Sequence, residues 1–197
     1  KTMDNFQISV TTVKRYLKEL LEQGILEEQK QSECGYRLKT EEYRFAYDAS
    51  DFLVEDKIYF QDILPLLQNI SKEASAIWSY AFMEMMNNAI EHANAEHISC
   101  YVKKDALYTE ISITDDGIGM QPDRLMRFRE SIMSDEISGK HIGMRNVHRR
   151  IQLHFGEAYG LKIDSEWQKG TTVTILLPVE EVNQAKEVTE DENRNCR

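Results

Sequence analysis

Apolar residues recur at helical spacing over two stretches of the chain, residues 77–95 and residues 144–155. Strict alternation of apolar and polar residues, which is typical of half-buried strands, marks residues 108–114, 159–165 and 171–177. The pattern therefore predicts two helices and three strands, with the last two strands joined by a turn at Trp167-Gln168-Lys169-Gly170.

The first predicted helix is largely apolar, yet it carries Glu84, Asn88 and His92 at positions i, i+4 and i+8, on one face. Polar groups on a buried helix need partners. An Asn carbonyl is an oxygen ligand that suits Mg²⁺, and a Glu one turn earlier can orient or deprotonate a nucleophile. The alternative is a satisfied buried polar network, and for His92 taken singly we favour that alternative.

The strand predicted at residues 108–114 leads directly into Asp115-Asp116-Gly117-Ile118-Gly119. A carboxylate at the end of a strand can accept a hydrogen bond from an exocyclic amine, and the two glycines let the backbone turn closely under a flat base. By itself this motif is equally well explained as an acidic β-turn.

A glycine-containing segment, Ser138-Gly139-Lys140-His141-Ile142-Gly143-Met144, precedes the helix at residues 144–155. Such a segment delivers backbone N–H groups and a helix N-terminus to one place, which is the form of a phosphate site. Arg145 lies in the first turn and is a candidate for phosphate contact, whereas we interpret Arg149 and Arg150 as a solvated face.

Four segments in this order resemble the N, G1, G2 and G3 boxes of the GHKL superfamily: residues 84–93, 115–120, 139–147 and 170–173. Gyrase, the ninety-kilodalton heat-shock chaperone, sensor histidine kinases and MutL share this ATP-binding fold. Residues 142–178 are particularly similar to sensor kinases of the LytS and YesM type, whereas residues 55–120 look more like ATPase domains that follow a DNA-binding module. The resemblance implies a Bergerat-type α/β fold, built as an α+β two-layer sandwich with helices over one face of a mixed sheet.

The resemblance also implies roles for the matching residues. Asn88 would coordinate Mg²⁺, Glu84 would be the catalytic general base of the hydrolysing members, and Asp115 would bind the adenine amino group. The other ATP-binding residues would be Asn87 and His92 near the phosphates, Gly117, Gly119 and Met120 around the base, Thr172 in the adenine-side water network, and Gly139, Lys140, Ile142, Gly143, Met144 and Arg145 in the phosphate loop and its helix. His141 stands where the family commonly has a glycine, and its Cβ disfavours a turn with positive φ.

The N-terminal part predicts an amphipathic helix over residues 8–26, capped by Ser9 or Thr11 and ended by Gly24, followed by a hairpin at residues 27–39. This resembles the recognition helix and wing of a winged helix-turn-helix protein, which implies DNA contacts by Thr11, Thr12, Lys14, Arg15 and Lys18. The alternative is a small helical hairpin that contacts another protein. Net charge does not distinguish DNA binding from protein contact, because residues 1–40 carry seven Lys and Arg against six Asp and Glu.

We expect four parts: a partial winged helix-turn-helix at 1–40, an ordered connector or first strand at 41–56, the ATPase domain at 57–179, and an acidic, disordered tail at 180–197. A helix interrupted near Pro65 is expected at residues 58–70. The preceding helix of the winged module is nearly missing, so we expect a fragment or an incomplete module. The 197 residues include no membrane-length apolar run, no signal sequence and three cysteines without metal-ligand spacing, which favours a cytoplasmic protein that does not meet a membrane.

The leading functional prediction is an ATP- and Mg²⁺-binding transcriptional regulator or signalling ATPase. Its nucleotide state would control DNA or partner binding through a lid at residues 126–141. One alternative is a protein kinase that transfers the γ-phosphate to histidine in a two-component system, or to serine as anti-sigma-factor kinases do. No histidine precedes Phe52 to serve as acceptor within the chain. The other is a nucleotide sensor without turnover. Expected partners are ATP, DNA, a response regulator or other protein, and a second copy.

Overall fold

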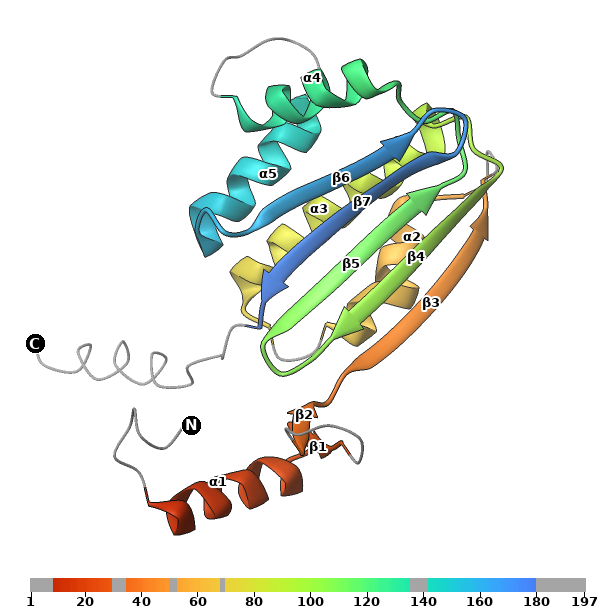
Figure 1. Cartoon of the computed structure of the whole chain (residues 1–197). Helices are drawn as coiled ribbons and strands as arrows, with labels where there is room; N and C mark the ends of the chain where they lie inside the picture. The colour runs from red at the N-terminus through yellow and green to blue at the C-terminus, as the bar shows by residue number, and fades with distance from the viewer. Residues whose placement is uncertain (1–8, 30–34, 50–52, 68–69, 135–141, 180–197) are drawn as a thin grey trace, which may run out of the picture.

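The structure is a computed structural model that describes residues 9–29, 35–49, 53–67, 70–134 and 142–179. Its main body is a five-stranded sheet with helices over one face (Figure 1). The strand order is β3-β4-β5-β7-β6. The strands are β3 (Glu41–Asp48), β4 (His97–Lys104), β5 (Tyr108–Asp115), β6 (Gly160–Glu166) and β7 (Gly170–Pro178). The expected two-layer α+β sandwich is confirmed.

Every pairing between the described strands of this sheet is antiparallel, so the predicted mixed sheet is wrong. The reason lies in the strand order. β5 and β6 run in the same direction, and the crossover through two helices that joins them is of the kind that parallel neighbours need. However, β7 inserts between β5 and β6, so the two strands never pair.

The longest helix, α3 (Lys72–His92), begins five residues before the predicted start because Ser71 caps it. The Ser71 side chain accepts a hydrogen bond from the N–H of Ala74 at 3.0 Å. The buried face of α3 includes Trp78, Phe82 and Met86, which join the hydrophobic core of the described residues. The sheet contributes alternate residues of its inner face to the same core, for example Ile111 and Ile113 on β5.

Two further helices, α4 (Pro122–Met133) and α5 (Ile142–Phe155), follow β5 and lead to β6. The buried His148 of α5 accepts the backbone N–H of Leu161 through Nδ1 at 3.0 Å, which ties α5 to β6. Burial lowers the pKa of His148, so the neutral, accepting imidazole is favoured. Residues 126–133 of the predicted lid belong to α4, and residues 135–141 lie outside the described part of the chain.

Strand β3 pairs with β4 along its whole length, so of the two predictions for this stretch, a connector or a first strand, the structure shows a strand. The interrupted helix expected at residues 58–70 is, as far as the structure describes it, a π-helical turn (Tyr59–Ile63) that continues α2 (Glu55–Ile58), followed by a 3₁₀ turn (Leu64–Leu66). Pro65 has no N–H to continue an α-helical ladder, which explains the change of helix type. Tyr47 on β3 donates to Asp62 Oδ2 at 2.9 Å and joins this segment to the strand.

The N-terminal part contains α1 (Val10–Glu22) and a hairpin of β1 (Leu26–Glu28) and β2 (Tyr36–Leu38). Ser9 is the cap, with its side chain accepting the N–H of Thr12 at 3.2 Å, and Gly24 follows the helix with φ of +70°. None of the residues of α1 is buried. A helix and a hairpin at the predicted places are confirmed, whereas the predicted tail at 180–197 lies outside the described residues.

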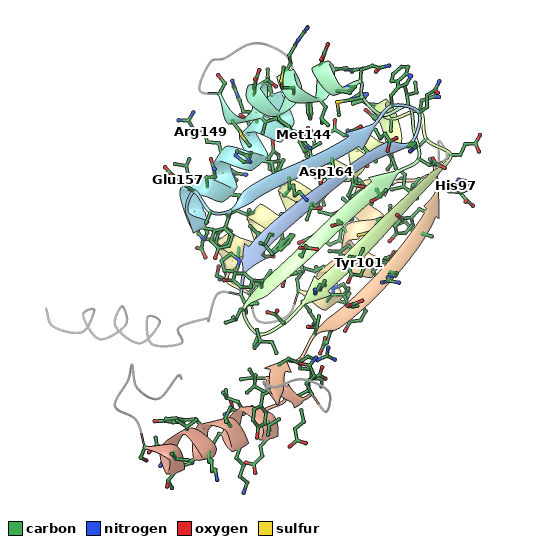
Figure 2. All side chains as sticks on the ribbon, in the orientation of Figure 1. His97, Tyr101, Met144, Arg149, Glu157 and Asp164 are labelled. Carbon is green, nitrogen blue, oxygen red and sulfur yellow. The ribbon has the colours of Figure 1, made fainter. Side chains whose placement is uncertain are left out.

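No helix in the described part of the chain covers the opposite face of the sheet (Figure 1), and this open face carries polar side chains. On it, Tyr101 of β4 lies under the guanidinium of Arg44, 5.1 Å from its Cζ to the ring centroid (Figure 2). Ser112 and Thr174 pair across β5 and β7, with their hydroxyl oxygens 2.9 Å apart. Among the described residues, no helix is long and apolar enough to cross a membrane.

Candidate functional site

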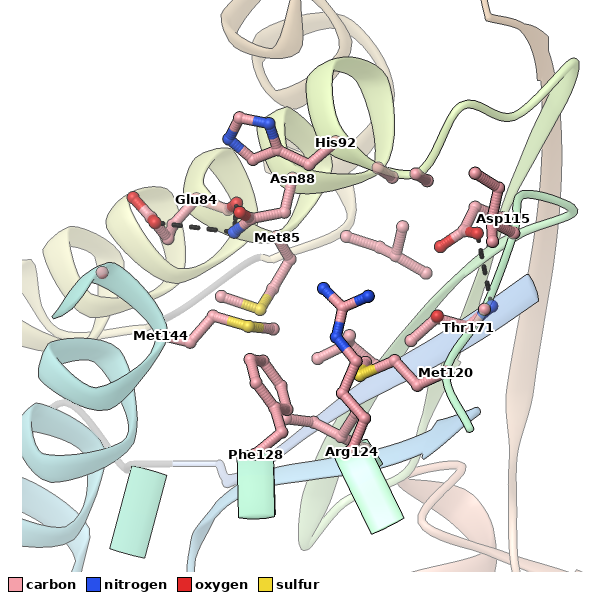
Figure 3. A pocket seen from close by; sticks show the side chains of 18 residues that line it. Glu84, Met85, Asn88, His92, Asp115, Met120, Arg124, Phe128, Met144 and Thr171 are labelled. Carbon is pink, nitrogen blue, oxygen red and sulfur yellow. Dashed lines mark hydrogen bonds between the residues drawn. The ribbon is translucent and has the colours of Figure 1, made fainter. Parts of the chain in front are cut away.

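A cavity of about 360 Å³ lies between the second half of α3, the loop after β5, the start of α4 and the start of α5 (Figure 3). Eight of the predicted site residues line it: Glu84, Asn88, His92, Asp115, Gly119, Met120, Gly143 and Met144. Three segments that are far apart in sequence therefore meet at one cavity, as the motif analysis expected.

One end of the cavity is formed by the last residue of β5. Asp115 is only 7% exposed, and its Oδ1 accepts the backbone N–H groups of Gly117 at 3.0 Å and of Thr171 at 3.3 Å. Burial raises the pKa of Asp115, although both hydrogen bonds oppose the rise. Ile163 and Val173 line the cavity beside it. A buried carboxylate in an apolar slot is suited to a flat ring that carries an amine.

The loop after Asp115 is held tightly between two parts of the fold. A Cβ at Gly117 would lie 2.1 Å from the carbonyl oxygen of Ala93, which also accepts the N–H of Ile118 at 3.0 Å. Gly119 has φ of +65°, and a Cβ there would lie 2.0 Å from the carbonyl oxygen of Glu166. Both glycines are therefore required by close approach, to the end of α3 on one side and to the β6–β7 turn on the other.

Asp116 fastens the same loop to the start of β4. Its Oδ1 accepts the backbone N–H groups of Glu96 at 2.8 Å and His97 at 2.9 Å, and its Oδ2 lies 2.8 Å from His97 Nδ1. The backbone N–H and then the ring of His97 lower the pKa of Asp116 to about 2, and Asp116 in turn raises the pKa of His97. His97 lies at the end of the sheet, outside the cavity (Figure 2).

The polar stripe of α3 forms the other end of the cavity. Asn88 Nδ2 donates to the backbone oxygen of Glu84 at 2.6 Å and lies 3.5 Å from Glu84 Oε1. No hydrogen bond to Asn88 Oδ1 is seen within the described residues, so this oxygen can face a cation. A Cβ at Gly143 would lie 1.7 Å from Glu84 Oε1, so the Glu84 carboxylate packs against the first turn of α5. That position is favourable for a negative charge.

Several predicted residues do not line the cavity. Thr172 lies on the open face of the sheet, with its Oγ1 2.9 Å from Thr114 Oγ1, whereas its neighbour Thr171 lines the cavity. Successive residues of a strand point to opposite faces, so a shift of one residue decides which threonine reaches the site. The cavity lining also lacks Asn87, Gly117, Ile142 and Arg145. Gly139 and Lys140, together with His141, lie outside the described residues.

Other lining residues were not predicted. Arg124 and Phe128 enter from α4, and their i, i+4 spacing was the available signal. Ser165 does not line the cavity, but it holds the loop after β5 in place. Its Oγ accepts the N–H of Met120 at 2.9 Å and donates to the Gly170 carbonyl at 3.0 Å. The remaining lining residues are mostly apolar: Met85, Ala89, Ala93, Ile113, Ile118, Ile163, Thr171 and Val173.

A protein-family model described as "Histidine kinase-, DNA gyrase B-, and HSP90-like ATPase" matches residues 76–181. The chain therefore belongs to this family, and the GHKL resemblance expected from the sequence is confirmed. The five-stranded α+β sandwich is consistent with its Bergerat-type fold, and domains of this family bind ATP with Mg²⁺.

Among curated proteins, the chain is similar to "Sensor protein kinase HptS" from Staphylococcus aureus strains USA300 and NCTC 8325 / PS 47. Each is 26% identical over 137 residues, which cover 67% of this chain and 26% of the relative. The matched part thus spans about a quarter of the length of these relatives.

Two solved structures are also similar. The "Mycobacterial sensor histidine kinase MprB" has a TM-score of 0.39 and 21% identity, over 54% of this chain and 73% of that one. The "Histidine kinase domain from Erythrobacter litoralis EL346 blue-light activated histidine kinase" has a TM-score of 0.34 and 20% identity, over 54% and 45% of the two chains.

Proposed function

We propose that the part of the chain from β3 to β7 is the ATP-binding domain of a protein kinase of the histidine-kinase type. It binds Mg²⁺-ATP and donates the γ-phosphate to a histidine on a partner. The observation that carries the proposal is that Asp115 and the Glu84–Asn88 stripe open onto one cavity beside the first turn of α5. The similarity to a sensor protein kinase favours a kinase over the transcriptional regulator that led the sequence-based predictions.

In this proposal, the nucleotide lies with its base at the Asp115 end. The carboxylate accepts a hydrogen bond from the exocyclic amine of adenine, and the side chains of Ile113, Ile163 and Val173 contact the ring. Thr171 takes the place that the sequence had assigned to Thr172, because Thr171 lines the cavity and its N–H donates to Asp115.

The phosphates extend towards α3 and the first turn of α5 in this proposal. Asn88 Oδ1 offers an oxygen ligand to Mg²⁺, while its amide nitrogen is held by Glu84. Among the described residues, no cluster of three His, Cys, Asp or Glu could hold a metal, which fits an ion that takes most ligands from water and phosphate. Bound Mg²⁺ would neutralise phosphate charge. Glu84 would orient or deprotonate the attacking group.

The remaining assignments stay predictions for the same site. His92 lines the cavity and is proposed to lie near the phosphates, as is Asn87. The backbone at Ile142 and Gly143 and the side chain of Arg145 would meet phosphate charge, together with Gly139 and Lys140. Met120 would contact the base.

Calorimetry of ATP binding, with and without Mg²⁺, tests the proposal on the wild type and on Asn88→Ala. We expect binding that depends on Mg²⁺ and weakens about tenfold or more in the variant, because a ligand oxygen is lost. Absence of binding at millimolar ATP in the wild type would contradict the proposal. Asp115→Asn separately tests the base end, since unchanged affinity there would overturn the assignment of the pocket.

Labelled γ-phosphate distinguishes the kinase from its alternatives. A histidine kinase labels a partner protein, and the label is lost in acid because phosphohistidine is acid-labile. An ATPase releases phosphate alone, and a sensor does neither while still binding ATP. Transfer to a response-regulator partner without a histidine intermediate would contradict the histidine-kinase assignment.

We also propose that residues 1–40 are part of a winged helix-turn-helix that binds DNA. A capped helix followed by a hairpin supports this, as do the exposed side chains of Thr11, Lys14, Arg15 and Lys18 on α1. Thr12 is a weaker candidate, because its Oγ1 lies 2.9 Å from Ser9 Oγ. The pairs Arg15–Glu19 and Lys18–Glu22 are exposed and separated by 3.7 and 3.6 Å, so they compete little with phosphates.

Salt-dependent DNA affinity tests this second proposal. The double variant Lys14→Ala with Arg15→Ala is expected to lower both the affinity and the slope of affinity against salt concentration, since two phosphate contacts are lost. An unchanged slope would leave the N-terminal part as a surface for protein contact.

A further inference from the structure

Arg124 is the one lysine or arginine, among the residues that the structure describes, that lines the cavity. It shares the cavity with two carboxylates, those of Glu84 and Asp115. The structure shows no ion pair between Arg124 and another described residue. A cation at this place can therefore meet a negatively charged ligand without first breaking an ion pair within the described fold.

The position of Arg124 follows from the way α4 docks. Arg124 and Phe128 are one turn apart and share a face of the helix, and Phe128 is buried against the core at the edge of the cavity. Arg129 Nε donates to the carbonyl of Ile163 at 2.8 Å, and its Nη2 lies 2.9 Å from Asp164 Oδ1. These contacts attach α4 to β6, so Arg124 projects from an anchored helix.

Figure 3 shows the guanidinium of Arg124 between the two ends of the cavity. Asp115 and Thr171 lie on one side of it, and Asn88 and His92 lie on the other. A nucleotide with its base at Asp115 and its metal at Asn88 would bring the phosphate next to the ribose into the space between. A guanidinium binds phosphate oxygens through two parallel N–H groups, which an ammonium cannot do.

We propose that Arg124 binds the phosphate next to the ribose and thereby makes the site prefer nucleoside phosphates to nucleosides. This inference rests on the proposed function, since it takes the cavity as the ATP site. Two other roles for Arg124 give different results: a cation stacked on the base, and a solvated surface arginine at the exposed start of α4.

The test measures the affinity of the full chain for adenosine, AMP and ATP. Arg124→Ala is expected to lower the affinity for AMP and for ATP about tenfold and the affinity for adenosine less than about twofold, because only the phosphate contact is lost. Arg124→Lys keeps the charge without the paired N–H groups, so its affinity for AMP and ATP should lie between those of the wild type and Arg124→Ala. The matched control is Arg127→Ala, on the same helix, exposed and absent from the cavity lining, and it should bind all three ligands like the wild type.

The outcomes separate this inference from the proposed function. Equal affinities for Arg124→Ala and Arg127→Ala would overturn it while leaving ATP binding in place. An equal loss for adenosine and AMP would overturn it too, since the arginine would then contact the base. Wild-type protein that binds neither AMP nor ATP would overturn both proposals. Thermal unfolding checks that each variant folds, and Arg124→Gln, closer in size, replaces the alanine variant if that one does not.

Discussion

At the scale of single residues, the carboxyl of Asp115 is the most unusual group of the site. It is buried at the end of a strand, and burial raises its pKa, while the N–H groups of Gly117 and Thr171 partly offset that rise. In the proposed complex, an amine donor on the bound base would favour the ionised form and so lower the pKa of Asp115. Ligand binding and proton release would then be linked at this residue.

We expect ATP binding to release protons between the pKa of Asp115 in the complex and its raised pKa in the free protein. Affinity should rise with pH across that window, as the free carboxyl ionises, and level off above it. Calorimetry in buffers of different ionisation enthalpy measures the release. The difference between wild type and Asp115→Asn isolates the carboxyl, since phosphate titration is common to both. The same proton release in both proteins would contradict the prediction.

At the scale of elements, the site depends on how the loop after β5 packs against three neighbouring segments. The end of α3, the start of β4 and the β6–β7 turn each contact it, through the carbonyls of Ala93 and Glu166 and the backbone N–H of His97. Two of these contacts also involve residues that line the cavity, Ala93 and Gly119. The loop is thus positioned by its neighbours in the fold, and its glycines allow those neighbours to approach.

Gly119→Ala should lower the free energy of unfolding more than Gly156→Ala, although both glycines have positive φ. At Gly156, where nothing lies within 4 Å of the added Cβ, only backbone strain of about 1 kcal/mol is expected. At Gly119 the Cβ also meets the carbonyl of Glu166, so a total of about 2–4 kcal/mol is expected. Urea unfolding measures the free energy of unfolding of each variant. Nucleotide affinity should fall in Gly119→Ala only. Equal losses at both positions would show that the close contact relaxes without cost.

At the scale of the whole molecule, β3 belongs to the sheet that carries the site, so we expect the folded unit with the site to begin at this strand. The predicted ATPase domain, residues 57–179, leaves this strand out, whereas β3 forms an edge of the five-stranded sheet. Tyr43, Phe45 and Tyr47 of β3 pack against the core. The N-terminal helix and hairpin contribute no strand to that sheet.

A chain that begins at residue 41 should therefore bind ATP with the affinity of the full chain. A chain that begins at residue 53 should unfold at a lower temperature, because it loses the edge strand and its three aromatic side chains. Thermal unfolding and calorimetry on the two truncated proteins check this. Weaker ATP binding after removal of residues 1–40 alone would instead place part of the N-terminal segment at the site.

The sequence by itself predicted helices α1, α3 and α5, the N-terminal hairpin, strands β5, β6 and β7, the boxes and eight of the residues that line the cavity, whereas β4 and α4 were not predicted. Helical spacing along α3, the Ser9 cap and the alternation on β5 are local properties, since they depend on neighbours a few positions away. The Asp-x-Gly-x-Gly motif likewise predicts its close turn, because few residues other than glycine tolerate that backbone.

Only the tertiary structure decided the antiparallel order of the sheet and the entry of Arg124 into the cavity. The choice of Thr171 over Thr172 follows instead from the alternation along β7, since Thr171 shares a face with Val173 and Ile175. The sheet order and the entry of Arg124 depend on which distant segments meet. β7 inserts between β5 and β6, and α4 docks through Phe128 and Arg129. Such long-range packing leaves no signal in local periodicity, which is why the motifs alone could not predict it.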